Sequence, residues 1–177
     1  MQYAMIFLKN STKKGKETFD KPKLIKYNKI DKLFAKDVIM IRKEAREALF
    51  TVLFAGEFDA EATPAELWEL AVEEGRFEKD TYARNLSLLI GEHMEEIISA
   101  GQSYAVGWKW SRISPVSRTV LKIALAEMFY MPDIPLLVSL NEAVDLSKKY
   151  DDDKAYGFIN GVLNAAMGDP RAVEEKK

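Results

Sequence analysis

The side chains that could carry out chemistry are few, and they do not form a catalytic group. His93 is the only histidine and cysteine is absent, so the chain has no histidine pair or thiolate for a metal. Asp151, Asp152 and Asp153 are adjacent, whereas a calcium loop alternates its acidic ligands and ends with a glutamate. The sequence shows no phosphate-binding loop, dinucleotide-binding glycine pattern or nucleophile elbow. We therefore expect no enzymatic activity, cofactor or metal site, and we interpret the aspartates as a helix N-cap.

The pattern best suited to binding is a group of basic residues near position 42. Arg42, Lys43 and Arg46 stand close together, and the two arginines are one helical turn apart. Guanidinium groups bind phosphate through two hydrogen bonds and stack on unpaired bases, so this group suits RNA. Taken alone, however, the three residues are typical of the solvated face of an amphipathic helix.

Apolar residues at helical spacing predict the elements that carry these side chains. Ala45, Ala48, Leu49, Val52 and Leu53 form one such apolar stripe. Helices are expected at 41–54, 64–74 and 82–99, from Pro115 to the prolines at 132 and 135, and twice within 135–167 on either side of the aspartates. No alternating strand pattern is convincing. The predicted fold class is all-α, a compact bundle of about six or seven helices.

Capping signals support several of these helix starts. Thr63 and Glu66 have the spacing of a capping box, and Ser114 precedes a proline at a first helical position. Ser139 and Glu142 have the spacing of a second capping box. We therefore expect helices to begin at each of these three places.

Charge divides the chain into parts. Residues 1–40 hold ten lysines and four acidic residues, whereas residues 41–177 hold 16 basic and 24 acidic residues. We predict a loosely ordered, lysine-rich extension at 1–39, a helical domain at 40–168 and a charged tail at 169–177. The extension has no assigned role, and Met40 is an alternative start of the native chain. The acidic domain excludes a generic nucleic-acid binder, because phosphate attraction depends on local positive charge.

No apolar run approaches the roughly 18 residues that a membrane span needs. The opening residues lack the charged region and the cleavage site of a signal peptide. Together with the absence of cysteine, these features predict a cytoplasmic protein.

Motifs along the second half of the chain resemble a known family. They are Trp108-Lys109-Trp110-Ser111-Arg112-Ile113, Val120-Leu121-Lys122-Ile123-Ala124, Glu127, Pro135, Asn141-Glu142-Ala143, Lys148, Phe158 and Asn160-Gly161-Val162-Leu163. Together with the opening Ile41-Arg42-Lys43-Glu44-Ala45-Arg46-Glu47-Ala48, this order resembles the NusB family of bacterial transcription antitermination factors over about 41–167. Each motif alone is weak, but the set in this order is specific to that fold.

The resemblance implies which residues bind RNA. The arginine-rich opening of NusB proteins meets boxA RNA, which implies that Arg42, Lys43 and Arg46 contact it. An aromatic residue at the place of Phe158 lies close to that RNA and can stack on a base. Asn160 is implied as a hydrogen-bonding group. Since the two arginines are expected to share an exposed face, their replacement by alanine should weaken RNA binding and leave stability nearly unchanged.

The resemblance also implies partners. NusB proteins pair with NusE, a ribosomal protein, and act in the RNA polymerase elongation complex, notably on ribosomal RNA operons. Some members self-associate, so a homodimer is left open. Two alternatives also stay open: a protein-interaction module without specific RNA binding, and an accessory module to an RNA-modifying enzyme. Glu44 interrupts the basic run and Gly157 stands where the family often has a basic residue, whereas Gly157 and Gly161 together suggest close helix packing.

Overall fold

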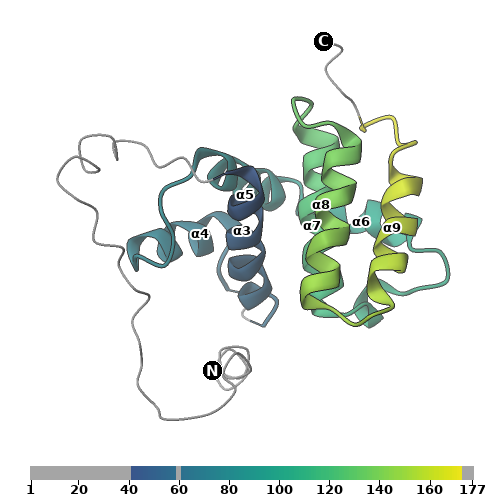
Figure 1. The fold of residues 1–177 in the computed structure, drawn as a ribbon, viewed down its shortest axis with the longest axis horizontal. Helices are drawn as coiled ribbons and strands as arrows, with labels where there is room; N and C mark the ends of the chain where they lie inside the picture. The colour runs from purple at the N-terminus through teal and green to yellow at the C-terminus, as the bar shows by residue number, and fades with distance from the viewer. Residues whose placement is uncertain (1–40, 59–60, 173–177) are drawn as a thin grey trace. The chain divides into compact units, whose positions relative to one another are not determined.

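The computed structural model describes residues 41–58 and 61–172, and these residues form seven α-helices and one short 3-10 helix (Figure 1). The helices, labelled as in Figure 1, are α3 (Arg42–Gly56), α4 (Pro64–Glu73), α5 (Thr81–Glu92), α6 (Met94–Tyr104), α7 (Pro115–Tyr130), α8 (Leu136–Tyr150) and α9 (Ala155–Ala166). The 3-10 helix η1 spans Trp110–Arg112. The described part of the chain contains no strand, so the predicted all-α class is confirmed.

Some expectations cannot be compared with the described residues. The lysine-rich extension at 1–39 and the last five residues of the tail lie outside them, so the predicted domain boundaries stay predictions. Within the described residues, every helix is too short or too polar to cross a membrane.

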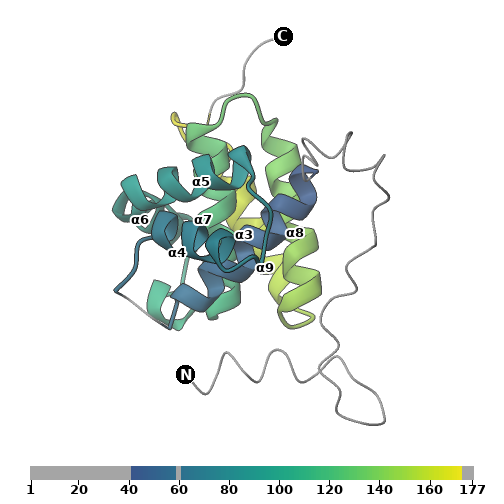
Figure 2. The same cartoon turned by 90° about the vertical axis from the view of Figure 1, so that its left-hand side faces the viewer.

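Helix α7 lies at the centre of the fold. It packs against α3, α5, α6, α8 and α9, which surround it in both views (Figures 1 and 2). Its side chains are buried almost all round from Val120 to Phe129, where the sequence predicted a single apolar stripe. A helix that is apolar on every side is typical of a core position, because no face of it needs to meet water.

Two of the three predicted helix starts are confirmed by their caps. Thr63 and Glu66 form a reciprocal capping box at the start of α4, and the hydroxyl of Ser114 accepts from the Ser117 amide at 2.9 Å. The box predicted at Ser139 and Glu142 is wrong. Helix α8 already begins at Leu136, so Ser139 lies inside it, buried, and Glu142 is available for another contact.

The predicted single helix at 82–99 is two helices, with the break at His93. The backbone of His93 leaves helical geometry at φ −110° and ψ 22°, and its ring stacks on Tyr130 of α7 at a centroid separation of 3.9 Å. The break follows Gly91, a residue of low helix propensity. The apolar period continues through the break because Ile90 and Ile97 are both buried, which is why periodicity alone predicted one helix.

Charged contacts attach the end of α3 to the beginning of α7. Glu57 follows the last residue of α3, and its side chain is 5% exposed. Its carboxylate accepts from Arg118 Nη2 at 2.7 Å and from Lys122, both in the first half of α7. These two cations neutralise a carboxylate that burial would otherwise destabilise.

The three aspartates at 151–153 form the corner between α8 and α9. The N-cap of α9 is Lys154 and not an aspartate, so the predicted N-cap is wrong. Asp152 lies two residues earlier, and its Oδ1 accepts from the amides of Lys154 and Ala155 at 2.8 and 2.9 Å, which holds the turn that leads into the helix. Asp151 instead accepts from the hydroxyls of Ser114 and Ser117, which ties the corner to the start of α7. The described residues contain no acidic or histidine cluster that could hold a metal.

We expect Leu163→Ala to lower the free energy of unfolding by about 2–5 kcal/mol. Leu163 is fully buried in the stripe of α9 that faces the core, so the substitution leaves a cavity. The matched control is Leu137→Ala on α8, where the side chain is 59% exposed and the expected loss is below about 0.5 kcal/mol. Urea titration measures both, and a loss below about 1 kcal/mol for Leu163→Ala would contradict this packing.

Candidate nucleic-acid interface

The first turn of α3 presents two of the predicted basic residues to solvent. Arg42 and Lys43 have side chains that are 53% and 57% exposed. Neither is free of acidic neighbours, however. Arg42 Nη2 lies 2.8 Å from Asp133 in the turn before α8, and Lys43 Nζ lies 3.1 Å from Asp145 on α8. Both cations remain accessible, but each already has a carboxylate partner.

Arg46 lies in the interior, and the predicted exposed face shared with Arg42 is wrong. Its side chain is only 3% exposed. The guanidinium Nε lies 2.5 Å from Glu127 on the central helix, and Nη1 lies 3.7 Å from Glu142 on α8. Its Cζ also lies 5.3 Å from the centre of the Tyr82 ring. Arg46 lies one turn further along α3 than Arg42, at the place where α3 contacts α7 and α8. Helical periodicity does not distinguish a buried cation from an exposed one.

The Arg46 contacts form a buried charged cluster with defined protonation. Burial is the strongest single influence and acts to lower the pKa of Arg46, but the charge of Glu127, the hydrogen bond to it and the charge of Glu142 act together with Tyr82 in the other direction, and the pKa lies above its ordinary value. The hydroxyl of Tyr82 in α5 donates a hydrogen bond to Glu127. Burial raises the pKa of Tyr82, so the phenol stays protonated. This cluster joins α3, α5, α7 and α8, which makes Arg46 a structural residue.

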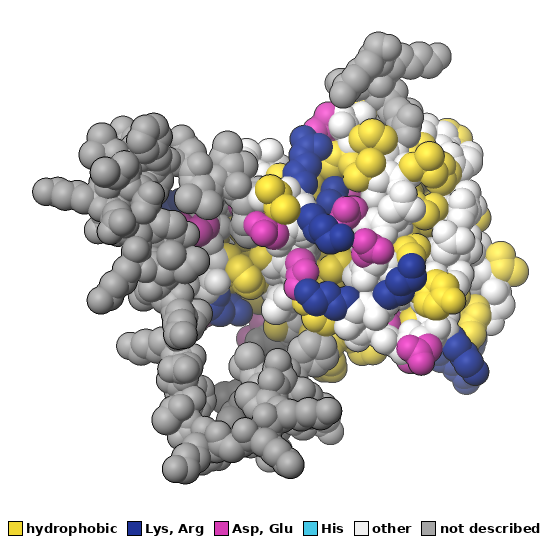
Figure 3. Space-filling model, in the orientation of Figure 1, with side chains coloured by type: hydrophobic (Ala, Val, Ile, Leu, Met, Phe, Trp, Pro, Cys, Tyr) yellow, Lys and Arg dark blue, Asp and Glu magenta, His cyan; other side chains and the backbone are white. Residues whose placement is uncertain are grey.

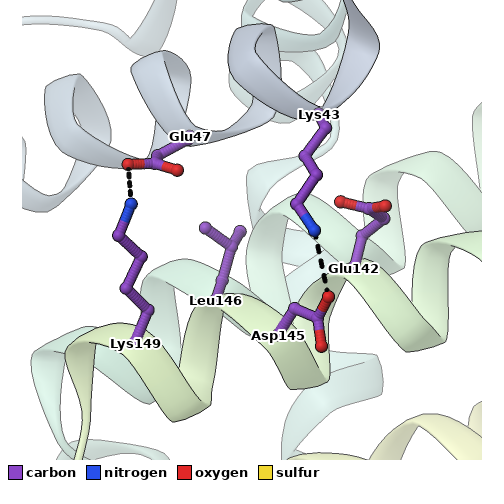
Figure 4. Close-up of a pocket in the computed structure, with 6 residues that line it drawn as sticks. All are labelled: Lys43, Glu47, Glu142, Asp145, Leu146 and Lys149. Atoms are coloured by element: carbon purple, nitrogen blue, oxygen red, sulfur yellow. Dashed lines mark hydrogen bonds and ion pairs between the residues drawn. The ribbon is translucent and has the colours of Figure 1, made fainter.

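A groove of about 240 Å³ separates α3 from α8, next to Lys43 (Figure 4). Its lining residues are Lys43, Glu47, Glu142, Asp145, Leu146 and Lys149. Lys149 donates to Glu47 across the groove, as Lys43 does to Asp145. Burial would raise the pKa of Glu47, but hydrogen bonds from Lys149 and Tyr150 outweigh it, and the pKa lies below its ordinary value.

The surface around this groove therefore carries both signs of charge. Figure 3 shows lysine and arginine side chains interleaved with acidic ones across the face over which α8 runs. The acidic partners Asp133, Glu142 and Asp145 were missed by sequence reasoning. They lie about 90–100 residues after their basic partners, and no local pattern connects charges at that separation.

Phe158 and Asn160 lie on α9, on either side of the buried Ile159. Phe158 is half-buried, and its ring centre lies 5.6 Å from that of Trp108 at an angle of 58°. Asn160 is exposed, and among the described residues its side chain makes no hydrogen bond; only its carbonyl oxygen accepts, from Asn164. Asn160 is therefore available to an external partner.

The glycines beside these two residues leave the helix surface open. A Cβ atom placed at Gly157 or Gly161 would meet no atom within 4 Å. Within the described residues, the close helix packing suggested by their spacing is therefore wrong. The face of α9 that carries Asn160 is exposed, and the two glycines leave space beside it.

The predicted residues thus occupy two places on either side of α8. Arg42 and Lys43 lie at the start of α3, and Lys43 contacts α8 through its ion pair with Asp145. Phe158 and Asn160 are on α9, which packs against the opposite side of α8 (Figure 1). A ligand that contacted both places would have to cross α8, as an extended polymer can.

Comparison with known proteins gives one consistent result. The NusB family model matches residues 41–167. The transcription antitermination protein NusB of Carboxydothermus hydrogenoformans is 36% identical over 130 residues, which cover 70% of this chain and 90% of that protein. The solved structure of T. maritima NusB has a TM-score of 0.67 at 29% identity, and the likeness covers 72% of this chain and 91% of that one.

A second solved structure contains ligands. It is described as the antitermination factors NusB and NusE in complex with double-stranded RNA. The likeness has a TM-score of 0.63 at 33% identity and covers 72% of this chain and 97% of the matched chain. The family match itself extends from the start of α3 to just past the end of α9.

We expect Arg46→Ala to lower the free energy of unfolding by about 3–5 kcal/mol, since it leaves the Glu127 carboxylate buried without a cation. Arg42→Ala is the matched control, because it removes an exposed ion pair on the same helix and should cost at most about 1 kcal/mol. Chemical denaturation measures both. Replacing Arg46 and Glu127 together by methionine should recover much of the loss. Equal, small losses for the two arginines would contradict the buried cluster.

Proposed function

Because this chain belongs to the NusB family, we propose that it is a transcription antitermination factor that binds boxA-type RNA together with the ribosomal protein NusE. The observation that carries this proposal is the family match over residues 41–167. The likeness to a NusB solved with NusE and double-stranded RNA supports it. The bound pair acts in the RNA polymerase elongation complex, notably on ribosomal RNA operons, and this places the chain in the cytoplasm.

Arg42, Lys43, Phe158 and Asn160 are the side chains that we propose for the RNA contact. The two cations are exposed at the start of α3, and Asn160 is exposed on α9. Arginine can hold a phosphate through two hydrogen bonds, and half-buried Phe158 keeps part of its ring available for a base. Arg46 supports this surface from below by fixing α3 to the core.

The ion pairs at this surface explain why a partner is needed. A phosphate that binds Arg42 or Lys43 must displace the carboxylate of Asp133 or Asp145. Exposed ion pairs are weak, so displacement is feasible, but it reduces the net gain from each phosphate. A basic ribosomal protein would add positive charge and would be attracted by a domain that holds 24 acidic and 16 basic residues from position 41 onward.

The proposed mechanism is binding alone, with no bond made or broken by this chain. The candidate residues comprise cations, an aromatic ring and an amide, which hold RNA. The hydrogen bond to Asp145 raises the pKa of Lys43, which keeps its amine protonated and therefore neither a nucleophile nor a base. A protein-interaction module without specific RNA binding is the alternative that the neutralised surface keeps open. Self-association of this chain, which the resemblance to the family leaves open, stays a prediction.

The test of the proposed function is a pair of titrations with boxA RNA and with a scrambled RNA of the same composition. We expect this chain to prefer boxA, and we expect NusE to increase both the affinity and the preference, because it supplies positive charge and further contacts. Fluorescence anisotropy measures both. If boxA and the scrambled RNA bind equally even with NusE present, the chain is a protein-interaction module.

We expect the double variant Arg42→Ala/Lys43→Ala to bind boxA more weakly and with a smaller dependence on salt. Loss of two phosphate contacts should reduce the slope of log K against log salt by about 1.4, at roughly 0.7 per phosphate of single-stranded RNA. The control is Arg84→Ala on α5, a similarly exposed arginine that pairs with Glu69 of α4 and is not among the proposed contacts. An unchanged slope in the double variant would move the phosphate site elsewhere.

A further inference from the structure

The loop between α6 and α7 presents an exposed tryptophan in a hollow of the surface. The hollow has a volume of about 440 Å³ and is lined by Gly107, Trp108, Lys109 and Arg112. Trp108 is 54% exposed, whereas Trp68 is fully buried. The side chain of Trp108 is therefore open to a ligand.

The loop holds Trp108 in a fixed place. The side chain of Gln102 donates to the carbonyl oxygen of Trp108 at 2.7 Å and accepts from the amide of Trp110 at 2.6 Å. Trp110 packs against Gly101 so closely that a Cβ there would lie 2.4 Å from its ring. Gly107 adopts φ +81°, which favours glycine and sets the turn before Trp108. The ring is therefore preorganised, and a ligand would not have to order the loop.

The two cations of the hollow differ from those at the start of α3. Lys109 and Arg112 are exposed, and neither forms an ion pair within the described residues. Arg42 and Lys43, by contrast, each have a carboxylate partner. A phosphate can therefore bind at the hollow without displacing an acidic side chain, which makes this the less neutralised basic site of the two.

The hollow is continuous with the RNA-contacting face proposed for α9. Trp108 and Phe158 lie ring to ring, with 5.6 Å between their centres. Tyr156, at the start of α9, has an exposed ring as well. Nζ of Lys148 in α8 lies 5.4 Å from the centre of that ring. Aromatic rings interleaved with cations are the composition of a surface that binds unpaired nucleotides, since bases stack on the rings and phosphates meet the cations.

We propose that Trp108 stacks on an unpaired base of the bound RNA, next to Phe158, and that Lys109 and Arg112 hold the flanking phosphates. This subsite rests on the proposed function and deepens it, because it assigns a nucleotide-binding role to the α6–α7 loop. It extends the RNA path from the start of α3, across α8 and α9, to the loop. The stacked nucleotide must be unpaired, since a base inside a duplex does not expose its face to a side chain.

The test uses the full chain with NusE and an unpaired boxA oligoribonucleotide. We expect Trp108→Leu to bind about tenfold more weakly, which corresponds to one lost stacking contact, and Trp108→Phe to recover part of the affinity. Val106→Ala is the matched control, because Val106 belongs to the same loop and is 86% exposed. It should bind as the wild type does. Lys109→Ala/Arg112→Ala should reduce the salt slope by about 1.4.

Two further measurements identify stacking itself. RNA binding should quench part of the tryptophan fluorescence of the wild type, and folded Trp108→Phe, saturated with the same RNA, should lose that quenching. An oligoribonucleotide with an abasic site at the stacked position should bind the wild type and Trp108→Leu equally.

The outcomes separate this subsite from the proposed function. If the wild type binds boxA but Trp108→Leu binds as tightly, without a loss of quenching in Trp108→Phe, the subsite is wrong and the proposed function stands. If Trp108→Leu weakens NusE binding and leaves RNA binding unchanged, Trp108 is a protein contact and the subsite is wrong. If the wild type does not distinguish boxA, the proposed function itself fails.

Discussion

The fold depends on one carboxylate that has no access to water. Glu127 is fully buried in α7, which packs against α3, α5, α6, α8 and α9. A buried carboxylate must be given a cation and hydrogen bonds, because removing it from water otherwise costs several kcal/mol. Arg46 from α3 and the phenol of Tyr82 from α5 meet this requirement at the same oxygen. The positions of α3 and α5 against the core are thus set by a charge as well as by apolar packing.

This constraint also determines what the surface can offer. With Arg46 directed inward, Arg42 and Lys43 lie one turn earlier, at the rim where α3 meets α8. There they meet Asp133 and Asp145, so the face that carries them is mixed in sign. Lys109 and Arg112, which form no ion pair within the described residues, lie instead in the α6–α7 loop, where Trp108 faces Phe158. If this face binds RNA as proposed, stacking and position would distinguish ligands more than total charge.

Much of the fold can be predicted from local sequence, and much of the site cannot. The helix starts at Pro64 and Pro115 follow from caps within four residues of each other, and the stripe of α3 follows from a period of 3.6. The role of Arg46 depends on Glu127, which lies 81 residues away, and no local pattern contains that contact. The break at His93 was missed for a related reason. The apolar period continues across it, and the ring of His93 stacks on Tyr130 of α7, a contact that local sequence does not contain.

The ion pairs of Glu57 and Arg46 have a consequence for topology. Helix α3 carries its buried cation near its beginning and a buried anion just after its end, whereas α7 carries Arg118 and Lys122 early and Glu127 late. The two helices therefore match only when they run in opposite directions. A parallel arrangement would bring Arg46 toward Arg118 and Glu57 toward Glu127, with like charges facing each other away from water. The order of the charges along the two helices thus disfavours the reversed direction of α3. Apolar stripes do not discriminate between the two directions, because they look alike from either end.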